Sequence, residues 1–272
     1  RHQSRYSSIT STDMILTAAF SPCPNDIFLF RSFLKDPQFR PLLNQVTIAD
    51  IETLNTLALQ RRLSLMKMSA ALFPLVSDYY NLMDVGNTLG YNSGPIVLSL
   101  DPECSLDTLA TPGEMTTAHA LCKLYYPKAK LIPMPYDKIL SAILQGKVDG
   151  GALIHEERFS YDLQLTLRAD FGELWRRKTI FPLPLGCLAI AKYVPMATVD
   201  ALTAALRKSL ICSLKDPITA GAKAVEYSKN KNVTVIHRFI GTYINKETFQ
   251  LSKTGKKALH MLWKANECCQ YT

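Results

Sequence analysis

Short apolar runs alternate with longer amphipathic stretches along the chain, and turn-forming residues separate them. Apolar runs of about four to eight residues are typical of buried strands, and longer stretches with a 3.6-residue period are typical of helices. Strands are predicted at residues 14–19, 46–49 and 63–68, with helices at 27–34 and 54–60 between them. This order of strands and helices indicates a parallel sheet with helices on its faces.

The same pattern begins again after the turn at Asp101-Pro102. Further strands are predicted at residues 108–111, 131–134, 150–155 and 183–191. Further helices are predicted at residues 118–126, 136–145, 200–214, 219–230 and 253–268. Two extended segments, near residues 95–100 and 185–192, are placed to carry the chain into a second α/β block and back.

We therefore expect an α/β protein of two lobes that are joined by a hinge, with a ligand cleft between them. The first lobe is predicted to hold residues 14–100 together with residues 190–272, and the second lobe residues 101–189. Residues 1–13 are polar and lack the apolar core of a secretory signal, so we expect a flexible tail before a natural start at Met14.

Composition and charge narrow the class of ligand. The chain has 272 residues, of which 47% are hydrophobic and 20% charged, and no apolar run approaches the roughly 20 residues that a membrane helix needs. The net charge is +8, but the basic residues are spread out and do not form one stripe with aromatic residues. This favours a small anionic ligand over nucleic acid or a membrane.

Cysteine usage and short motifs exclude several kinds of site. The seven cysteines are scattered, and neither a CxxC pair nor the His/Cys spacing of a zinc site occurs. We expect reduced thiols in a cytoplasmic protein. The motifs GxGxxG, GxxxxGK[ST], HExxH and GxSxG are also absent, so dinucleotide, NTP, zinc-protease and α/β-hydrolase sites find no support.

His155 stands at the end of a predicted buried strand, directly after the small and apolar residues 150–154. The carboxyl ends of strands in open α/β sheets face the ligand crevice. An imidazole at that place can take and give a proton near neutral pH, which makes His155 a candidate general base. The alternative is a hydrogen-bonded loop histidine without a catalytic role.

Two other segment ends are candidates for binding an anion. Thr116 or Thr117 begins a predicted helix, and the free N–H groups and positive dipole end of a helix N-terminus attract carboxylates. Lys67 and Ser69 end a predicted strand, where the first could pair with an anion and the second could hold it. The alternatives are that the threonine or Ser69 only caps its own helix and that Lys67 is solvated.

Polar residues near other turns allow two readings as well. Asn25 or Asp26 is expected to cap the helix at residues 27–34, and a cap explains Asp50 more simply than a ligand does. Residues 90–95 could form a surface turn. The alternating prolines of residues 182–186 could line a cleft wall or merely end a helix.

Six short motifs, taken in order, resemble those of one family. They are SPCPND at residues 21–26, DIETLN at 50–55, KMS at 67–69, PGxxTTA at 112–118, GxLIHExRFxY at 151–161 and PLPLG at 182–186. Together they resemble the 1,4-dihydroxy-6-naphthoate synthases of the futalosine route to menaquinone. The resemblance runs from Met14 to the region of residues 243–245. It implies the type 2 periplasmic-binding-protein fold, with a mixed or parallel sheet flanked by helices in each lobe, in a cytoplasmic enzyme that needs no cofactor and no metal.

The resemblance also implies roles at matching positions. His155 corresponds to the catalytic proton acceptor of the family. Substrate-binding positions correspond to Lys67, Met68, Ser69, Thr117 and Ala118, and the motifs with Asp50, Asn55 and Asn25 line the same cleft. The chain departs from the family where Ile27 and Ile180 replace Thr and Gly and where Met68 replaces Leu. We expect these departures to affect the edge of the cleft and the details of substrate recognition, and not the fold.

The implied reaction is a carbon–carbon lyase step. Cyclic dehypoxanthinylfutalosine, a fused-ring acid with a spiro sugar, loses its sugar-derived portion and becomes 1,4-dihydroxy-6-naphthoate. The alternatives are chorismate dehydratase of the same pathway and a non-catalytic solute-binding protein for a small carboxylate. The LIHE and PLPLG motifs favour the synthase over the dehydratase, and a solute-binding protein would need an export signal or lipid anchor, of which none is visible.

Overall fold

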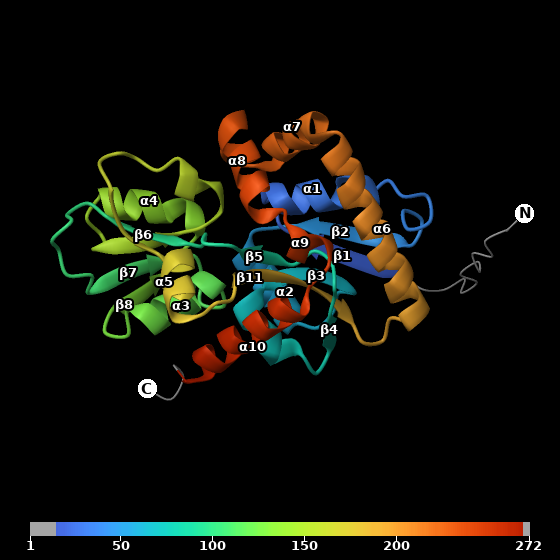
Figure 1. Ribbon diagram of the computed structural model, residues 1–272, viewed down its shortest axis with the longest axis horizontal. Helices are drawn as coiled ribbons and strands as arrows, with labels where there is room; N and C mark the ends of the chain where they lie inside the picture. The colour runs from blue at the N-terminus through green and yellow to red at the C-terminus, as the bar shows by residue number, and fades with distance from the viewer. Residues whose placement is uncertain (1–14, 269–272) are drawn as a thin grey trace, which may run out of the picture.

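A computed structural model describes residues 15–268, which form two α/β lobes side by side (Figure 1). The tail expected at residues 1–13 and the start expected at Met14 lie outside the described residues. No helix within the described part of the chain is long and apolar enough to span a bilayer.

The first lobe is built on a mixed sheet of six strands. Their order is β2 (Leu43–Ile48), β1 (Leu16–Phe20), β3 (Leu65–Ser69), β11 (Leu183–Ala191) and β4 (Tyr80–Leu82), and β5 (Thr88–Gly90) also pairs with β11. The strand β1 runs parallel to β2 and β3, as the sequence predicts. The returning strand β11 runs antiparallel to β3, β4 and β5, which makes the sheet mixed.

Helices cover both faces of this sheet (Figure 1). The helix α1 (Pro24–Phe33) begins with a proline at its first position, where a missing N–H costs nothing, and its Phe30 ring stacks on Phe20 of β1 with centroids 4.2 Å apart. Burying such a ring contributes roughly 1.5–3 kcal/mol. The helices of this lobe are α1, α2 (Ile51–Leu59), α6 (Met196–Lys215), α7 (Pro217–Tyr227), α8 (Val233–Tyr243), α9 (Lys246–Phe249), α10 (Lys253–Cys268) and the 3₁₀ helix η1 (Ala70–Val76).

The second lobe is built on a sheet of five strands. Their order is β10 (Thr166–Asp170), β6 (Ile96–Ser99), β9 (Gly150–Leu153), β7 (Thr108–Thr111) and β8 (Lys130–Pro133). Its helices are α3 (Thr117–Tyr125), α4 (Tyr136–Leu144), α5 (Phe171–Lys178) and the 3₁₀ helix η2 (His155–Phe159).

The glycines that begin β9 let this strand pack closely. A Cβ at Gly151 would lie 2.5 Å from the side chain of Ile139 in α4, and one at Gly150 would lie 2.7 Å from the carbonyl oxygen of Leu98. Because neither position has room for a side chain, β9 lies directly against α4 at Gly151 and close to the strand β6 at Gly150. This packing fixes where the chain leaves the sheet toward His155, two residues after the end of β9.

The strand pairing places both crossings earlier than the sequence suggests. The segment 96–99 pairs in the second sheet as β6, so the chain changes lobes between Gly90 and Ile96. It returns before Leu183, since β11 pairs in the first sheet along its length. The domain boundaries at 100/101 and 189/190 remain a prediction, whereas the change of sheet falls several residues before each of them.

Candidate active site

One cavity lies between the lobes and is lined by residues of both. From the first lobe it is lined by Ser21, Cys23, Asn25, Asp26, Ile51, Lys67, Ser69, Thr88, Leu185, Gly186, Phe239 and Tyr243. From the second lobe and the first crossing it is lined by Gly94, Pro95, Thr116, Thr117, Ala118, Ile154, His155 and Arg158. Of the segments 90–95 and 182–186, only Gly94, Pro95, Leu185 and Gly186 line the cavity, and the prolines at 182 and 184 do not.

The N-terminus of α3 opens into this cavity. Thr116 is the N-cap, because its hydroxyl accepts a hydrogen bond from the His119 N–H at 3.2 Å. The N–H groups of Thr117 and Ala118 belong to the first turn and have no acceptor among residues 15–268. The predicted helix cap is therefore confirmed at Thr116, while anion binding by the next two N–H groups stays a prediction.

The side chain of Thr117 joins the two lobes. Its hydroxyl donates to the carbonyl oxygen of Leu185 at 2.9 Å and accepts from the Ala71 N–H at 3.2 Å. Both partners belong to the first lobe, next to the end of β3. The start of α3 and the end of β3 therefore meet at one place on the cavity wall.

Ser69 lies at that place and is held by Asn55. The Ser69 N–H donates to Asn55 Oδ1 at 2.9 Å, and the Asn55 amide donates to Ser69 Oγ at 3.0 Å. Since the hydroxyl accepts this bond, its own proton is free for a ligand. Asn55 itself is fully buried and does not line the cavity, so it positions Ser69.

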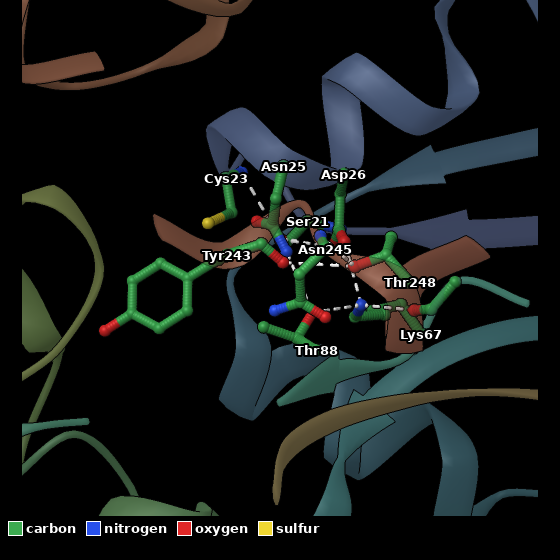
Figure 2. Close-up of polar contacts among 10 residues, drawn as sticks. Ser21, Cys23, Asn25, Asp26, Lys67, Thr88, Tyr243, Asn245 and Thr248 are labelled. Atoms are coloured by element: carbon green, nitrogen blue, oxygen red, sulfur yellow. Dashed lines mark hydrogen bonds and ion pairs between the residues drawn. The ribbon is translucent and has the colours of Figure 1, made fainter. Parts of the chain in front are cut away.

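Lys67 is buried and paired within the first lobe (Figure 2). Its ammonium group lies 3.0 Å from Asp26 Oδ1 and donates to Gly86 O at 2.7 Å and to Thr88 Oγ1 at 2.9 Å. Thr88 also accepts from the Asn25 amide at 2.9 Å. The ammonium group thus makes two hydrogen bonds and one ion pair within the first lobe, and Lys67 forms part of the cavity wall.

The expectation that Asn25 or Asp26 caps α1 is wrong. The helix begins at Pro24 with Cys23 at the N-cap, so both residues lie in the first turn. Asp26 instead accepts hydrogen bonds from the Ser21 N–H at 3.2 Å and from its hydroxyl at 2.6 Å. The Pro24 ring makes the earlier start possible, since proline suits the first position of a helix.

Two other residues of the predicted site lie away from the cavity. Met68 is fully buried in the core of the first lobe, because side chains alternate along β3 and its neighbours Lys67 and Ser69 point the other way. Asp50 caps α2, accepting from the Glu52 and Thr53 N–H groups at 3.1 Å each. Asp50 lines a second, smaller hollow that also touches His155.

The departures at residues 27 and 180 also lie outside the cavity. Ile27 is buried in the core of the first lobe, and Ile180 is 92% exposed. Neither side chain is among those that line the cavity between the lobes.

His155 lies on the cavity wall at the start of η2. The predicted strand over residues 150–155 ends at Leu153, and His155 has a φ of 57°, in the left-handed region that most side chains avoid. Its ring packs edge-on against Tyr136 with centroids 5.0 Å apart, and it has no hydrogen bond to any residue in the range 15–268. Burial lowers the pKa of the imidazole below its usual range, and the carboxylate of Glu156 opposes this effect.

Sequence reasoning did not single out Arg158, Tyr243 or Thr88, which also line the cavity. Arg158 follows His155 by three residues, and residues three apart in a 3₁₀ helix lie on the same side. Its guanidinium group is paired with Asp170 at 2.7 Å, while its Nε has no hydrogen-bond partner within residues 15–268. Among residues 15–268 no group of three His, Cys, Asp or Glu side chains could hold a metal ion.

Comparison with known proteins gives a consistent result. A family model described as menaquinone biosynthesis matches residues 16–267. A 1,4-dihydroxy-6-naphthoate synthase from Thermus thermophilus is 34% identical over 251 residues, covering 91% of this chain and 92% of that protein.

Solved structures agree with the fold. Protein AF1704 from Archaeoglobus fulgidus is 30% identical, with a TM-score of 0.90, and the match covers 96% of this chain and 100% of that one. The alkanesulfonate-binding protein SsuA from Xanthomonas axonopodis pv. citri is 13% identical, with a TM-score of 0.67 and coverage of 96% and 94%. The expected two-lobed, periplasmic-binding-protein-like α/β fold is therefore confirmed.

Proposed function

The chain belongs to the menaquinone biosynthesis family, and we propose that it is the carbon–carbon lyase that forms 1,4-dihydroxy-6-naphthoate from cyclic dehypoxanthinylfutalosine. One observation carries the proposal. A single cavity is lined both by an imidazole without a protein hydrogen bond in the described chain, His155, and by the start of α3, where the N–H groups of Thr117 and Ala118 have no acceptor among residues 15–268. The name of the Thermus relative agrees with this reaction.

The carboxylate of the substrate would bind where the lobes meet. The N–H groups of Thr117 and Ala118 and the hydroxyl of Ser69 provide donors there, and the positive end of the α3 dipole favours the negative charge. Lys67 lines the same cavity, with its ammonium group paired with Asp26 and hydrogen-bonded to Gly86 and Thr88.

His155 would act as the general base. Burial favours the neutral form of its imidazole, which is the form that accepts a proton, and the lowered pKa keeps it neutral at pH 7. Loss of the sugar-derived portion gives an aromatic product, so the protein mainly needs to orient the substrate and place one base. A positioned base contributes about 10²–10⁴-fold to the rate, and the cavity between the lobes would exclude water.

The test is a pair of substitutions at His155. His155→Asn removes the base and keeps a residue that tolerates positive φ, whereas His155→Ala removes the base without that tolerance. Both should lower naphthoate formation by about 10²–10⁴-fold, measured by product absorbance and mass. The Asn variant should keep the melting temperature of the wild type, and an Asn variant with wild-type turnover would refute the role of the base.

The same assay separates the alternatives. Wild-type protein is incubated in parallel with cyclic dehypoxanthinylfutalosine and with chorismate, and the products are identified by mass. Conversion of chorismate alone would indicate the dehydratase, and binding without conversion of either would indicate a solute-binding protein. Independence from a cofactor and the cytoplasmic location remain predictions of the resemblance.

A further inference from the structure

Glu156 is a buried carboxyl group directly after His155, and its hydrogen-bond partners come from the other lobe. The side chain is 5% exposed. Its Oε1 accepts hydrogen bonds from the Ser228 hydroxyl and from the Asn230 N–H, the second at 3.3 Å. Both donors lie in residues 228–230, which connect α7 to α8 in the first lobe. Since a buried carboxylate is costly without donors, this loop determines where Glu156 lies.

The same loop also contacts Tyr136, whose ring packs against the His155 ring. The ammonium group of Lys229 lies 2.8 Å from Asp137 Oδ2 and 4.5 Å from the centre of the Tyr136 ring, both in α4. The next residue of the loop donates from its side-chain amide to Ser160 Oγ at 2.8 Å, just beyond η2. Because the Tyr136 ring packs against His155, the loop contacts both supports of the imidazole.

His155 needs such support, because no hydrogen bond from another described residue orients its ring. Its backbone is held at positive φ, so its place depends on the residues that fix the start of η2. We propose that Glu156 is the positioning residue of His155, anchored across the cleft by the loop 228–230. This inference rests on the proposed role of His155 as the base. It means that the base reaches its working position only when the lobes are together.

Glu156 also supplies charge. The titratable groups that face the imidazole are Glu156 in η2, Asp26 in α1, Asp50 before α2, Lys229 in the loop, Tyr136 in α4 and Cys23 before α1. The carboxylates stabilise the imidazolium that forms when the base takes a proton, whereas burial and Lys229 oppose it. Loss of the Glu156 charge therefore lowers the pKa of His155.

The first measurement needs no substrate. The ring proton signals of the five histidines are followed by NMR against pH, with His155→Asn to assign the signal of His155. Glu156→Gln keeps both hydrogen bonds but removes the charge, so the His155 pKa should fall. The matched control is Glu157→Gln, because Glu157 is the adjacent carboxyl group and, unlike Glu156, its side chain has no hydrogen bond to the loop among the described residues. This variant should leave the measured pKa of His155 unchanged.

The second measurement is turnover. Glu156→Ala loses the anchor and should lower kcat by about 10- to 100-fold, as expected for a misplaced base, with a smaller change in KM. Ser228→Ala changes a residue of the other lobe, and it should also lower kcat, by a smaller factor than Glu156→Ala. Glu156→Gln should retain most of the turnover, with the acid limb of its kcat/KM profile moved to lower pH. Melting temperatures show whether each variant folds.

The outcomes are distinct. A His155 titration that Glu156→Gln does not move, or a kcat that Glu156→Ala and Ser228→Ala leave unchanged, overturns the inference. A fall in melting temperature with unchanged kcat per folded molecule also overturns it, since it indicates a purely structural carboxylate. Wild-type protein that forms no naphthoate instead overturns the proposed function, and the NMR titration still reports whether Glu156 acts on His155.

Discussion

The imidazole of His155 combines two properties at the scale of a single residue. It is buried enough for its pKa to fall below the usual 6.5, and it lines a cavity where a ligand can reach it. The side chain is partly exposed, and within the described chain its ring has no hydrogen bond. A ring in this environment is suited to proton transfer with a bound ligand.

The lowered pKa predicts the pH dependence of activity. A base works when neutral, so kcat/KM should be constant near neutral pH and fall only as the pH drops through a pKa below 6.5. The profile is measured with initial rates between pH 5 and pH 8, as far as the fold stays intact by circular dichroism. An acid limb above pH 6.5 would contradict the assignment.

The pair of Lys67 and Asp26 is a second residue-scale feature. Lys67→Met leaves Asp26 buried without its cation and should destabilise the protein by about 3–5 kcal/mol. The double variant with Asp26→Asn should recover a large part of this loss, because the remaining amide is neutral. Urea unfolding of the two variants measures the difference, and a single variant as stable as the wild type would show that the pair is not needed.

Much of the cavity wall could be predicted from single positions, because His155, Ser69 and Thr117 each follow a recognisable end of a strand or start of a helix. Met68 shows what single positions do not predict. Side chains alternate along β3, so the Met68 side chain points into the core, and this orientation is set by the sheet as a whole. Thr88 and Tyr243 escaped prediction because only the tertiary fold brings β5 and α8 to the cavity.

At the scale of elements, the turn before α3 decides where the N–H groups of Thr117 and Ala118 lie, which we propose bind the carboxylate. Gly113 has a φ of 128°, and a Cβ there would lie 2.3 Å from the Glu52 side chain. Glu52 itself accepts from the Met115 N–H at 3.1 Å and from the Asn55 amide at 3.2 Å. The turn is thus coupled through Glu52 to the residue that holds Ser69.

Gly113→Ala should therefore weaken both stability and binding. We expect a loss of about 1–3 kcal/mol in the free energy of unfolding, from backbone strain and the clash, together with a higher KM for the carboxylate substrate. The control is Gly146→Ala, where φ is 64° but no atom lies within 4 Å of the added Cβ. That variant should lose stability through the backbone alone and keep the KM, and an equal KM in both variants would contradict the coupling.

Helices and strands were predictable where their pattern was clear. The segments 108–111, 183–191 and 253–268 form β7, β11 and α10 with the predicted bounds. The helix α8 was missed, because its first turns are rich in Val, Thr and Ile, which favour strands, and packing against α1 and α7 decides its conformation. Strands as short as β4 and β5 carry too few residues for any pattern.

At the scale of the whole molecule, the net charge of +8 should act on an anionic substrate at a distance. Raising the salt concentration from 0.1 M to 1 M shortens the screening length from about 10 Å to about 3 Å. We expect kcat/KM to fall while kcat at saturation stays constant, measured with sodium chloride and compared with an uncharged osmolyte. A kcat/KM that is independent of salt would show that the overall field does not assist binding.

The position of β11 has a consequence for how the protein is made. This strand lies between β3 and β4 in the first sheet, yet about 100 residues separate Leu82 from Leu183 along the chain. At a synthesis rate of roughly 5–20 residues per second, β3 remains without its pairing partner β11 for about 5–20 seconds while the ribosome makes the intervening residues. The nascent first lobe thus exposes an unpaired strand edge throughout the synthesis of the second, and that interval is when it needs a chaperone most.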